Sequence, residues 1–116
     1  IMTASVSAHN GAEFPEYCAS KGGVLAYTKN VALRVAKYGA TCNSISAGGV
    51  ITELNAHILE NKSLWDQVMA ETLIPKWATV EEMAEWTYFL AVVNKSMTAQ
   101  DVLIDNGEIA KANFVW

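Results

Sequence analysis

Short apolar runs alternate with longer segments of helical periodicity along this chain, and this alternation constrains its fold more than any other feature. Residues 1–5, 40–46 and 101–105 are a few residues long and suit strands, whereas residues 16–38, 54–70 and 79–93 suit helices. Strands that alternate with helices favour a parallel sheet, because each parallel connection has to cross over the sheet. We therefore predict an α/β fold in the order β-α-β-α-α-β.

Local signals mark the limits of two of the helices. Pro15 suits the first turn of the long helix, where a missing N–H costs nothing, and Gly39 suits its end. Apolar side chains recur at three- and four-residue steps over residues 24–38 and form a broad stripe, so we expect this helix to be covered on two sides. Thr79 and Glu82 have the spacing of a capping box and predict the start of the last helix.

The composition of the chain argues against several classes of function. Of its 116 residues 52% are hydrophobic and 17% charged, so either the chain is buried on several sides or part of its surface faces a partner. A net charge of −4 argues against a nucleic-acid partner, which would need a basic surface. No apolar stretch is long enough for a membrane span, and no signal peptide is visible. We therefore expect no membrane partner.

The cysteines and histidines show no pattern of a metal site. Cys18 and Cys42 lack ligand spacing and are too few for a disulfide scaffold, so we interpret them as reduced thiols of a cytoplasmic protein. His9 and His57 have no Cys or second His at ligand spacing. We predict no metal, and we interpret both histidines as exposed.

Tyr17 and Lys21 form a candidate proton-transfer pair. They are four residues apart at the start of the long helix and therefore share one face. A nearby ammonium and a helix N-terminus both favour the phenolate that a tyrosine needs for proton exchange near neutrality. By itself the Tyr-x-x-x-Lys spacing arises by chance in many helices, so its surroundings decide how it is interpreted.

Two further features fall at the same predicted edge of the sheet. Ser5 ends the first strand, where open α/β sheets place their sites, and its hydroxyl could donate to a carbonyl oxygen. The alternative is that Ser5 caps the strand or the following loop. Ser7 is a neighbouring candidate for the same role. The second strand ends in the Gly-rich stretch "AGGV", whose backbone amides could meet a ligand.

Four ordered segments resemble motifs of the short-chain dehydrogenases/reductases. "TASVSA" is similar to the strand-end serine segment, "YCASK" to Tyr-x-x-x-Lys, "CNSISAGGVITE" to Asn-x-Ile-x-Pro-Gly-x-Val-x-Thr, and "MTAQDVLIDNGE" to the closing Thr-Gly-x-x-Val-x-x-Asp-Gly-Gly segment. The resemblance implies that residues 1–116 are the C-terminal portion of one NAD(P)-binding domain with a Rossmann-like, doubly wound parallel sheet. Because the family's Gly-rich pyrophosphate turn is not in the chain, we expect the dinucleotide-binding half to lie upstream of residue 1.

The resemblance also implies a function and residue roles. The protein would be an NAD(P)-dependent oxidoreductase that interconverts a small-molecule secondary alcohol and a carbonyl by hydride transfer. Tyr17 would exchange a proton with the substrate oxygen, Lys21 would support Tyr17 and bind the nicotinamide ribose, and Ser5 would hold the substrate oxygen. The nicotinamide side of NAD or NADP would contact Tyr17, Lys21 and four loop residues, Ala47, Gly48, Val50 and Thr52. Ser7 and Trp65 are further candidate substrate contacts, because Ser7 adjoins Ser5 and Trp65 falls in the family's substrate lid.

Three positions depart from the family pattern. Ala47 replaces a proline and leaves the backbone of its loop less restricted. Ala99 replaces a glycine, which costs free energy if the position needs a positive φ. Glu108 replaces the second glycine of the closing motif.

A second interpretation is a non-catalytic module that acts only through oligomer assembly. The family resemblance implies a homo-oligomer, a dimer or a tetramer, with the long helix and the last helix–strand unit at its interfaces. The final "NFVW", with Trp116, could join such a contact. We expect the isolated 116-residue chain to be inactive and to show no measurable NAD(H) binding.

Overall fold

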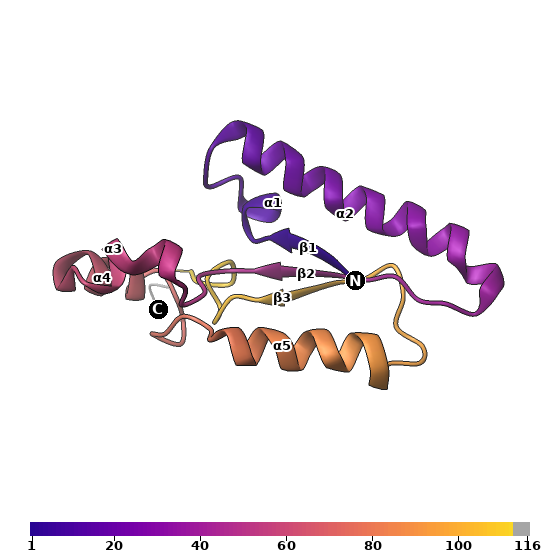
Figure 1. Cartoon of the computed structure of the whole chain (residues 1–116). Coiled ribbons are helices and arrows are strands. Elements are labelled where there is room, and N and C mark those ends of the chain that lie inside the picture. Colours follow the sequence, from indigo (N-terminus) through magenta and orange to yellow (C-terminus); the bar gives the residue numbers. More distant parts are fainter. Residues whose placement is uncertain (113–116) are drawn as a thin grey trace.

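A parallel three-stranded sheet organises the chain (Figure 1). The structure is a computed structural model that describes residues 1–112; the predicted contact of Trp116 lies outside the described residues. Strands β1 (Met2–Ser5), β2 (Ser44–Ala47) and β3 (Asp101–Ile104) pair in the order β1-β2-β3. The register sets Ser5 beside Ala47 and Ala47 beside Ile104, so the carboxyl ends of all three strands meet at one edge. The predicted α/β fold with a parallel sheet is confirmed.

The helices lie on either side of these strands, with α2 along one side and α5 along the other (Figure 1). In chain order they are α1 (Ser7–Asn10), α2 (Pro15–Val35) with the 3₁₀ turn η1 (Ala36–Tyr38), η2 (Glu53–Asn55), α3 (Ala56–Leu59), α4 (Lys62–Met69), and α5 (Val80–Tyr88) with the π-helical turn η3 (Phe89–Val93). Within the described residues, no helix has the length and apolar character to cross a membrane.

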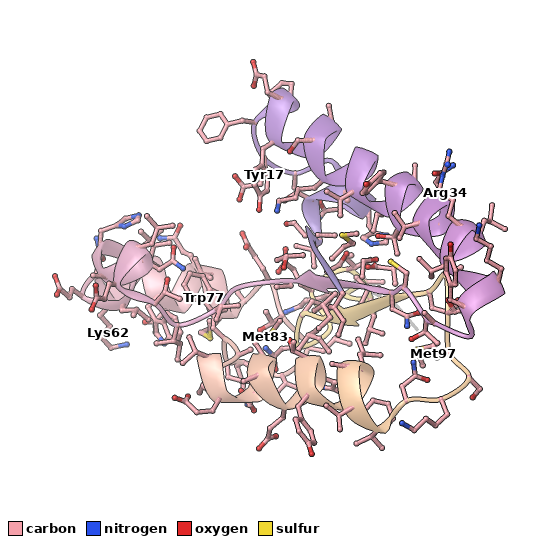
Figure 2. All side chains as sticks on the ribbon, turned by 45° about the vertical axis from the view of Figure 1, so that its right-hand side comes forward. Tyr17, Arg34, Lys62, Trp77, Met83 and Met97 are labelled. Atoms are coloured by element: carbon pink, nitrogen blue, oxygen red, sulfur yellow. The ribbon has the colours of Figure 1, made fainter. Side chains whose placement is uncertain are left out.

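The long helix forms where the sequence predicts it. Pro15 occupies its first position, and Gly39 closes the following 3₁₀ turn with φ 68°. Thr28 and Ala32 are buried on the inner face. The outer face differs from the prediction, because within this chain Tyr27 and Leu33 are exposed, and Arg34 points away from the sheet (Figure 2). The broad apolar stripe is thus covered on one side only.

Three segments differ from the sequence-based assignment. Residues 7–10, which lie outside the helices predicted from the sequence, form α1, because the N–H groups of His9 and Asn10 turn back to the carbonyl of Val6. Residues 40–43 are not part of β2: Cys42 donates its N–H to the Thr98 side chain instead of to a strand. The helical segment 54–70 is divided at "ENKS", where the side chain of Asn61 accepts from the N–H of Leu64 and starts α4.

Buried polar side chains connect the sheet to its surroundings. Asn43 donates from Nδ2 to the Met97 carbonyl at 2.8 Å and accepts from the Gln100 N–H at 3.1 Å. Asn43 therefore connects the residue before β2 to the loop that leads into β3. His9 is exposed, as predicted, and it also reaches the sheet: its Nε2 lies 2.8 Å from Asp101 Oδ2. No buried side-chain polar atom in residues 1–112 lacks a hydrogen-bond partner.

The loop after β2 is held by the segment that precedes α5. Ala78 donates its N–H to the Gly49 carbonyl at 3.0 Å and accepts from the Ile51 N–H at 2.9 Å, and Val50 and Ala78 form a parallel bridge. This short pairing extends the sheet edge beyond β2. It fixes residues 49–51 over the carboxyl ends of the strands.

Candidate active site

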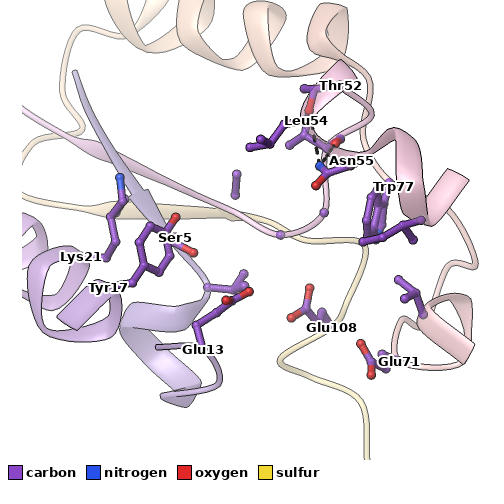
Figure 3. A pocket seen from close by; sticks show the side chains of 18 of the residues that line it. Ser5, Glu13, Tyr17, Lys21, Thr52, Leu54, Asn55, Glu71, Trp77 and Glu108 are labelled. Atoms are coloured by element: carbon purple, nitrogen blue, oxygen red, sulfur yellow. Dashed lines mark hydrogen bonds between the residues drawn. The ribbon is translucent and has the colours of Figure 1, made fainter. Parts of the chain in front are cut away.

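A pocket of about 640 Å³ opens at the carboxyl edge of the sheet (Figure 3). It collects side chains and backbone from the end of β1, the first turns of α2 and the loop after β2. Seven of the residues singled out from the sequence line it: Ser5, Tyr17, Lys21, Ala47, Gly48, Val50 and Thr52. Ser7 and Trp65 are not among the lining residues.

Ser5 is positioned by its neighbour Ser7. Ser5 is buried at the end of β1, and its hydroxyl accepts from the Ser7 N–H at 3.2 Å while its hydrogen points to Ser7 Oγ, also at 3.2 Å. Ser7 therefore lies behind Ser5 and orients it. Because a hydroxyl hydrogen rotates freely about its C–O bond, Ser5 can turn the same hydrogen toward an oxygen in the pocket.

Tyr17 and Lys21 lie on one face of the first turns of α2, as their spacing predicts. Lys21 Nζ is 5.5 Å from the centre of the Tyr17 ring and donates to the Thr3 carbonyl at 3.1 Å. Met2 and Val6 direct their N–H groups to β2, so the carbonyl of Thr3 between them points to the opposite edge of β1. Lys21 thus attaches α2 to β1 and brings Tyr17, which is 41% exposed, beside Ser5 (Figure 3).

The hydroxyl of Thr52, in the loop after β2, can turn its hydrogen toward the pocket. Asn55 donates from Nδ2 to the Val50 carbonyl at 2.9 Å and to Thr52 Oγ1 at 3.4 Å, which leaves the Thr52 hydroxyl hydrogen available. Asn55 itself lines the pocket and was missed from the sequence. Its only signal was its position three residues after Thr52, a spacing at which side chains can bond locally in a turn.

Three glutamates at the pocket were also missed as site residues. Glu13, Glu71 and Glu108 come from separate segments, and all three line the pocket (Figure 3). Burial raises the pKa of Glu108 above its usual range, and the negative charges of Asp105, Glu71 and Glu13 raise it further. The sequence did mark Glu108 as a departure from a glycine, but it did not connect Glu108 with Glu13 and Glu71.

Trp77, and not Trp65, forms the aromatic wall of the pocket. The Trp65 ring meets the Trp77 ring edge to face, with centroids 5.4 Å apart and an interplanar angle of 77°. Trp65 therefore supports the wall from behind. Its contact with a substrate stays a prediction.

The side chains at this pocket fit the nicotinamide end of a dinucleotide and not its diphosphate. Lys21 and the Thr52 hydroxyl offer donors suited to a ribose and an amide, whereas the acidic side chains Glu13, Glu71 and Glu108 would repel phosphate oxygens. Within residues 1–112, no three His, Cys, Asp or Glu side chains are grouped so that they could hold a metal ion.

The fold and the pocket define the class of protein first: part of a Rossmann-like α/β domain with a serine, a tyrosine and a lysine at the carboxyl edge of its sheet. A family model described as enoyl-(acyl carrier protein) reductase matches residues 1–108. The chain belongs to the short-chain dehydrogenase/reductase family.

Individual relatives agree with this assignment. The chain is 28% identical over 109 residues to L-rhamnose 1-dehydrogenase (NADP(+)) of Thermoplasma acidophilum, covering 92% of this chain and 43% of the relative. It is 31% identical over 110 residues to a 3-oxoacyl-[acyl-carrier-protein] reductase of Chlamydia pneumoniae, covering 92% and 43%. The structure of 4-hydroxyisoleucine dehydrogenase complexed with NADH superposes with a TM-score of 0.85 at 28% identity, covering 95% of this chain and 46% of that one. The chain thus spans less than half the length of these relatives.

Proposed function

We propose that the protein is an NAD(P)-dependent oxidoreductase that interconverts a secondary alcohol and a carbonyl compound, and that residues 1–116 form the C-terminal portion of its NAD(P)-binding domain. The observation that supports this most directly is that Ser5, Tyr17 and Lys21 meet at one pocket beside the loop 47–52. Membership of a family whose named relatives are dehydrogenases and reductases that use NADP or bind NADH supports the same proposal.

Each residue has a role that its place at the pocket allows. Ser5 donates its hydroxyl hydrogen to the substrate oxygen, and Tyr17 gives that oxygen a proton in reduction or takes one in oxidation. Lys21 holds a positive charge near Tyr17, and with Thr52 it holds the nicotinamide end of the cofactor. When bound, NAD(P) supplies or accepts the hydride. The chain's own contribution is to position the oxygen and to move the proton.

Substitution of Tyr17 tests this function. In the protein in its native length, Tyr17→Phe removes the proton-carrying oxygen and is expected to lower the rate of NAD(P)-linked turnover by about 100-fold or more. Tyr38→Phe is a matched control, because Tyr38 is exposed in η1, outside the pocket. Activity of Tyr17→Phe within about twofold of the unsubstituted protein would rule out this assignment of Tyr17.

We also propose that the protein assembles as a homo-oligomer. Large apolar side chains are exposed on the outer face of α2 and along α5 and η3, among them Tyr27, Leu33, Trp86, Tyr88 and Val93. Faces of this kind mark protein–protein contacts. A dimer or tetramer measured by light scattering is the expected result, and a monomer at micromolar concentration would contradict it.

The non-catalytic alternative rests on the same exposed faces. If the protein acts only through assembly, it forms oligomers, shows no NAD(P)-linked turnover and is indifferent to Tyr17→Phe. The free thiols of Cys18 and Cys42 support the further proposal that the protein works in a reducing compartment, the cytoplasm.

A further inference from the structure

The carboxylates of Glu13, Glu71 and Glu108 form an acidic wall in the same pocket as the proposed catalytic residues. Glu13 lies between α1 and α2, Glu71 follows α4, and Glu108 follows β3. Figure 3 shows the three side chains in a row along one side of the pocket, with Glu13 nearest to Ser5 and Tyr17. The fold therefore brings three negative charges from distant parts of the chain to one wall.

No ion pair among residues 1–112 neutralises a carboxylate of this acidic wall. The ion pairs within residues 1–112 join His9 to Asp101, Lys62 to Asp66, and Lys76 to Glu82, and none involves the three carboxylates. Lys111 borders a neighbouring depression together with Glu71 and Glu108, but its ammonium donates to the carbonyls of Ala70 and Thr72. Among the described residues that line the pocket, Lys21 is the one cationic side chain, and it donates a hydrogen bond to the Thr3 carbonyl.

Repulsion among these carboxylates has a direct consequence for a ligand. Burial raises the pKa of Glu108, and the charges of Asp105, Glu71 and Glu13 raise it further. Ionising the Glu108 carboxyl in the pocket therefore costs free energy. A cation in the pocket relieves that cost, whereas an anion adds to it. Because the pocket shields its contents from part of the solvent, both effects exceed those at an open surface.

The rest of the lining limits where the charge of a ligand can lie. Apolar side chains, including Val50, Leu54 and Trp77, line the pocket together with Ser5, Tyr17 and the acidic wall. They suit a hydrocarbon segment. A ligand that meets all three kinds of surface has a reactive oxygen at one end, a short alkyl part and a positive group at the other end.

We propose that the substrate is a secondary alcohol or ketone that carries a positively charged amine, and that Glu108 and Glu71, with Glu13, select it. This inference rests on the proposed function, because the site is the pocket of Ser5, Tyr17 and Lys21; the carboxylates decide which substrates enter it. Carboxylic acids, phosphorylated sugars and thioesters of phosphate-bearing carriers are selected against.

A binding measurement tests the charge preference without any turnover. The protein in its native length is titrated with butylammonium, butanol and butyrate at constant ionic strength, and binding is followed by calorimetry. Butylammonium is expected to bind at least about tenfold more tightly than butyrate. The combined substitution Glu71→Gln and Glu108→Gln is expected to abolish this preference, whereas Glu85→Gln, on the exposed face of α5, removes one charge outside the pocket and is expected to preserve it.

Equal binding of butylammonium and butyrate overturns the proposal, as does a preference for butylammonium that survives the combined substitution. Because glutamine has nearly the shape of glutamate and removes repulsion at Glu108, the variant is expected to fold, which circular dichroism checks.

Turnover separates this inference from the proposed function. The substrates are three secondary alcohols of equal chain length whose far end carries an ammonium, a hydroxyl or a carboxylate group. Turnover that depends on Tyr17 and favours the ammonium compound supports both proposals. Turnover that depends on Tyr17 without that preference overturns the substrate class alone. Butylammonium binding together with activity indifferent to Tyr17→Phe overturns the proposed function and leaves the cation preference standing.

Discussion

The indole of Trp77 occupies the space that a β-carbon on Gly49 would need. Gly49 therefore lets the loop 47–52 lie directly against the aromatic wall of the pocket. The contact is reinforced by the backbone, because the residue after Trp77 donates its N–H to the Gly49 carbonyl at 3.0 Å.

We predict that Gly49→Ala displaces the loop from Trp77. The variant is expected to lose about 1–3 kcal/mol of stability from overpacking, and at least about tenfold in activity, because the loop carries Thr52. Thermal unfolding and steady-state kinetics measure the two effects. Trp77→Leu in the same chain makes room for the new methyl group, so a double-mutant cycle is expected to show recovery.

Gly23→Ala is the control for this prediction. A β-carbon at Gly23 meets nothing within 4 Å, and the residue lies inside α2. The same substitution there is expected to raise stability by about 0.5–1 kcal/mol through helix propensity. Equal effects at Gly49 and Gly23 would show that the contact with Trp77 does not constrain the loop.

Ala99 holds a backbone conformation that disfavours its side chain. Its φ is 59°, and its N–H donates to the Cys42 carbonyl at 2.8 Å. This hydrogen bond holds the backbone of Ala99 in that conformation just before β3. The sequence-based expectation that alanine costs free energy at a position of positive φ therefore applies. Ala99→Gly is predicted to stabilise the protein by about 0.5–1 kcal/mol in denaturant unfolding, after allowance for the greater entropy of the unfolded glycine chain.

Ala26→Gly provides the opposite case. Ala26 lies in the middle of α2 with helical backbone, so glycine there is expected to cost about 1 kcal/mol. Destabilisation by both substitutions would mean that the conformation of Ala99 is not a source of strain.

The capping box at the start of α5 is predicted to support the protein's stability. Thr79 Oγ1 accepts from the Glu82 N–H at 3.2 Å, and Glu82 Oε2 accepts from the Thr79 N–H at 2.8 Å. Thr79→Ala removes the first of these bonds and is expected to cost about 1 kcal/mol in chemical denaturation. Thr79→Ser keeps an equivalent oxygen, so a loss as large as that of alanine would argue against the cap as its cause.

Glu108 is predicted to make stability depend on pH. Its pKa in the folded protein is raised above 4.5 by burial and by neighbouring carboxylates, so the folded state holds the proton more strongly than the unfolded state. The contribution of Glu108 is therefore fully present below that ordinary value and is lost as pH rises through the raised pKa. Glu108→Gln is expected to gain stability relative to the unsubstituted protein as pH rises from about 4.5 to 7.

Unfolding free energies of both proteins at several pH values check this prediction. Glu85→Gln removes a charge of the same sign from an exposed position and serves as the control. If the difference between Glu108→Gln and the unsubstituted protein does not change with pH, Glu108 is not the group responsible.

Features that depend on near neighbours in the chain were predictable. Pro15 at the start of α2, Gly39 after its last turn and the Thr79–Glu82 box all follow from local backbone chemistry, and the structure confirms them. The gathering of Ser5, Tyr17 and Lys21 was also predictable, because the carboxyl ends of parallel strands meet at one edge. Their roles in proton transfer stay predictions.

Features that depend on distant contacts were missed. The short helix α1 was not predicted, because its first turn bonds to the carbonyl of Val6, whose own N–H is bonded to the Ala47 carbonyl of β2. Trp65 was singled out, but of the tryptophans within residues 1–112 it is Trp77 that lines the pocket. Nothing in the spacing of the two rings along the chain tells which will face inward.

The sequence by itself determined the alternation of the three strands with α2 and α5, the first residues of these two helices and the edge at which the candidate site lies, since periodicity and capping act over a few residues. Only the tertiary structure decided the charge of the pocket. Glu13, Glu71 and Glu108 stand in three irregular segments far apart in the sequence, and each alone resembles an ordinary surface glutamate. They act together because the loops around the sheet edge converge there, and carboxylates influence one another through distance in space rather than along the chain.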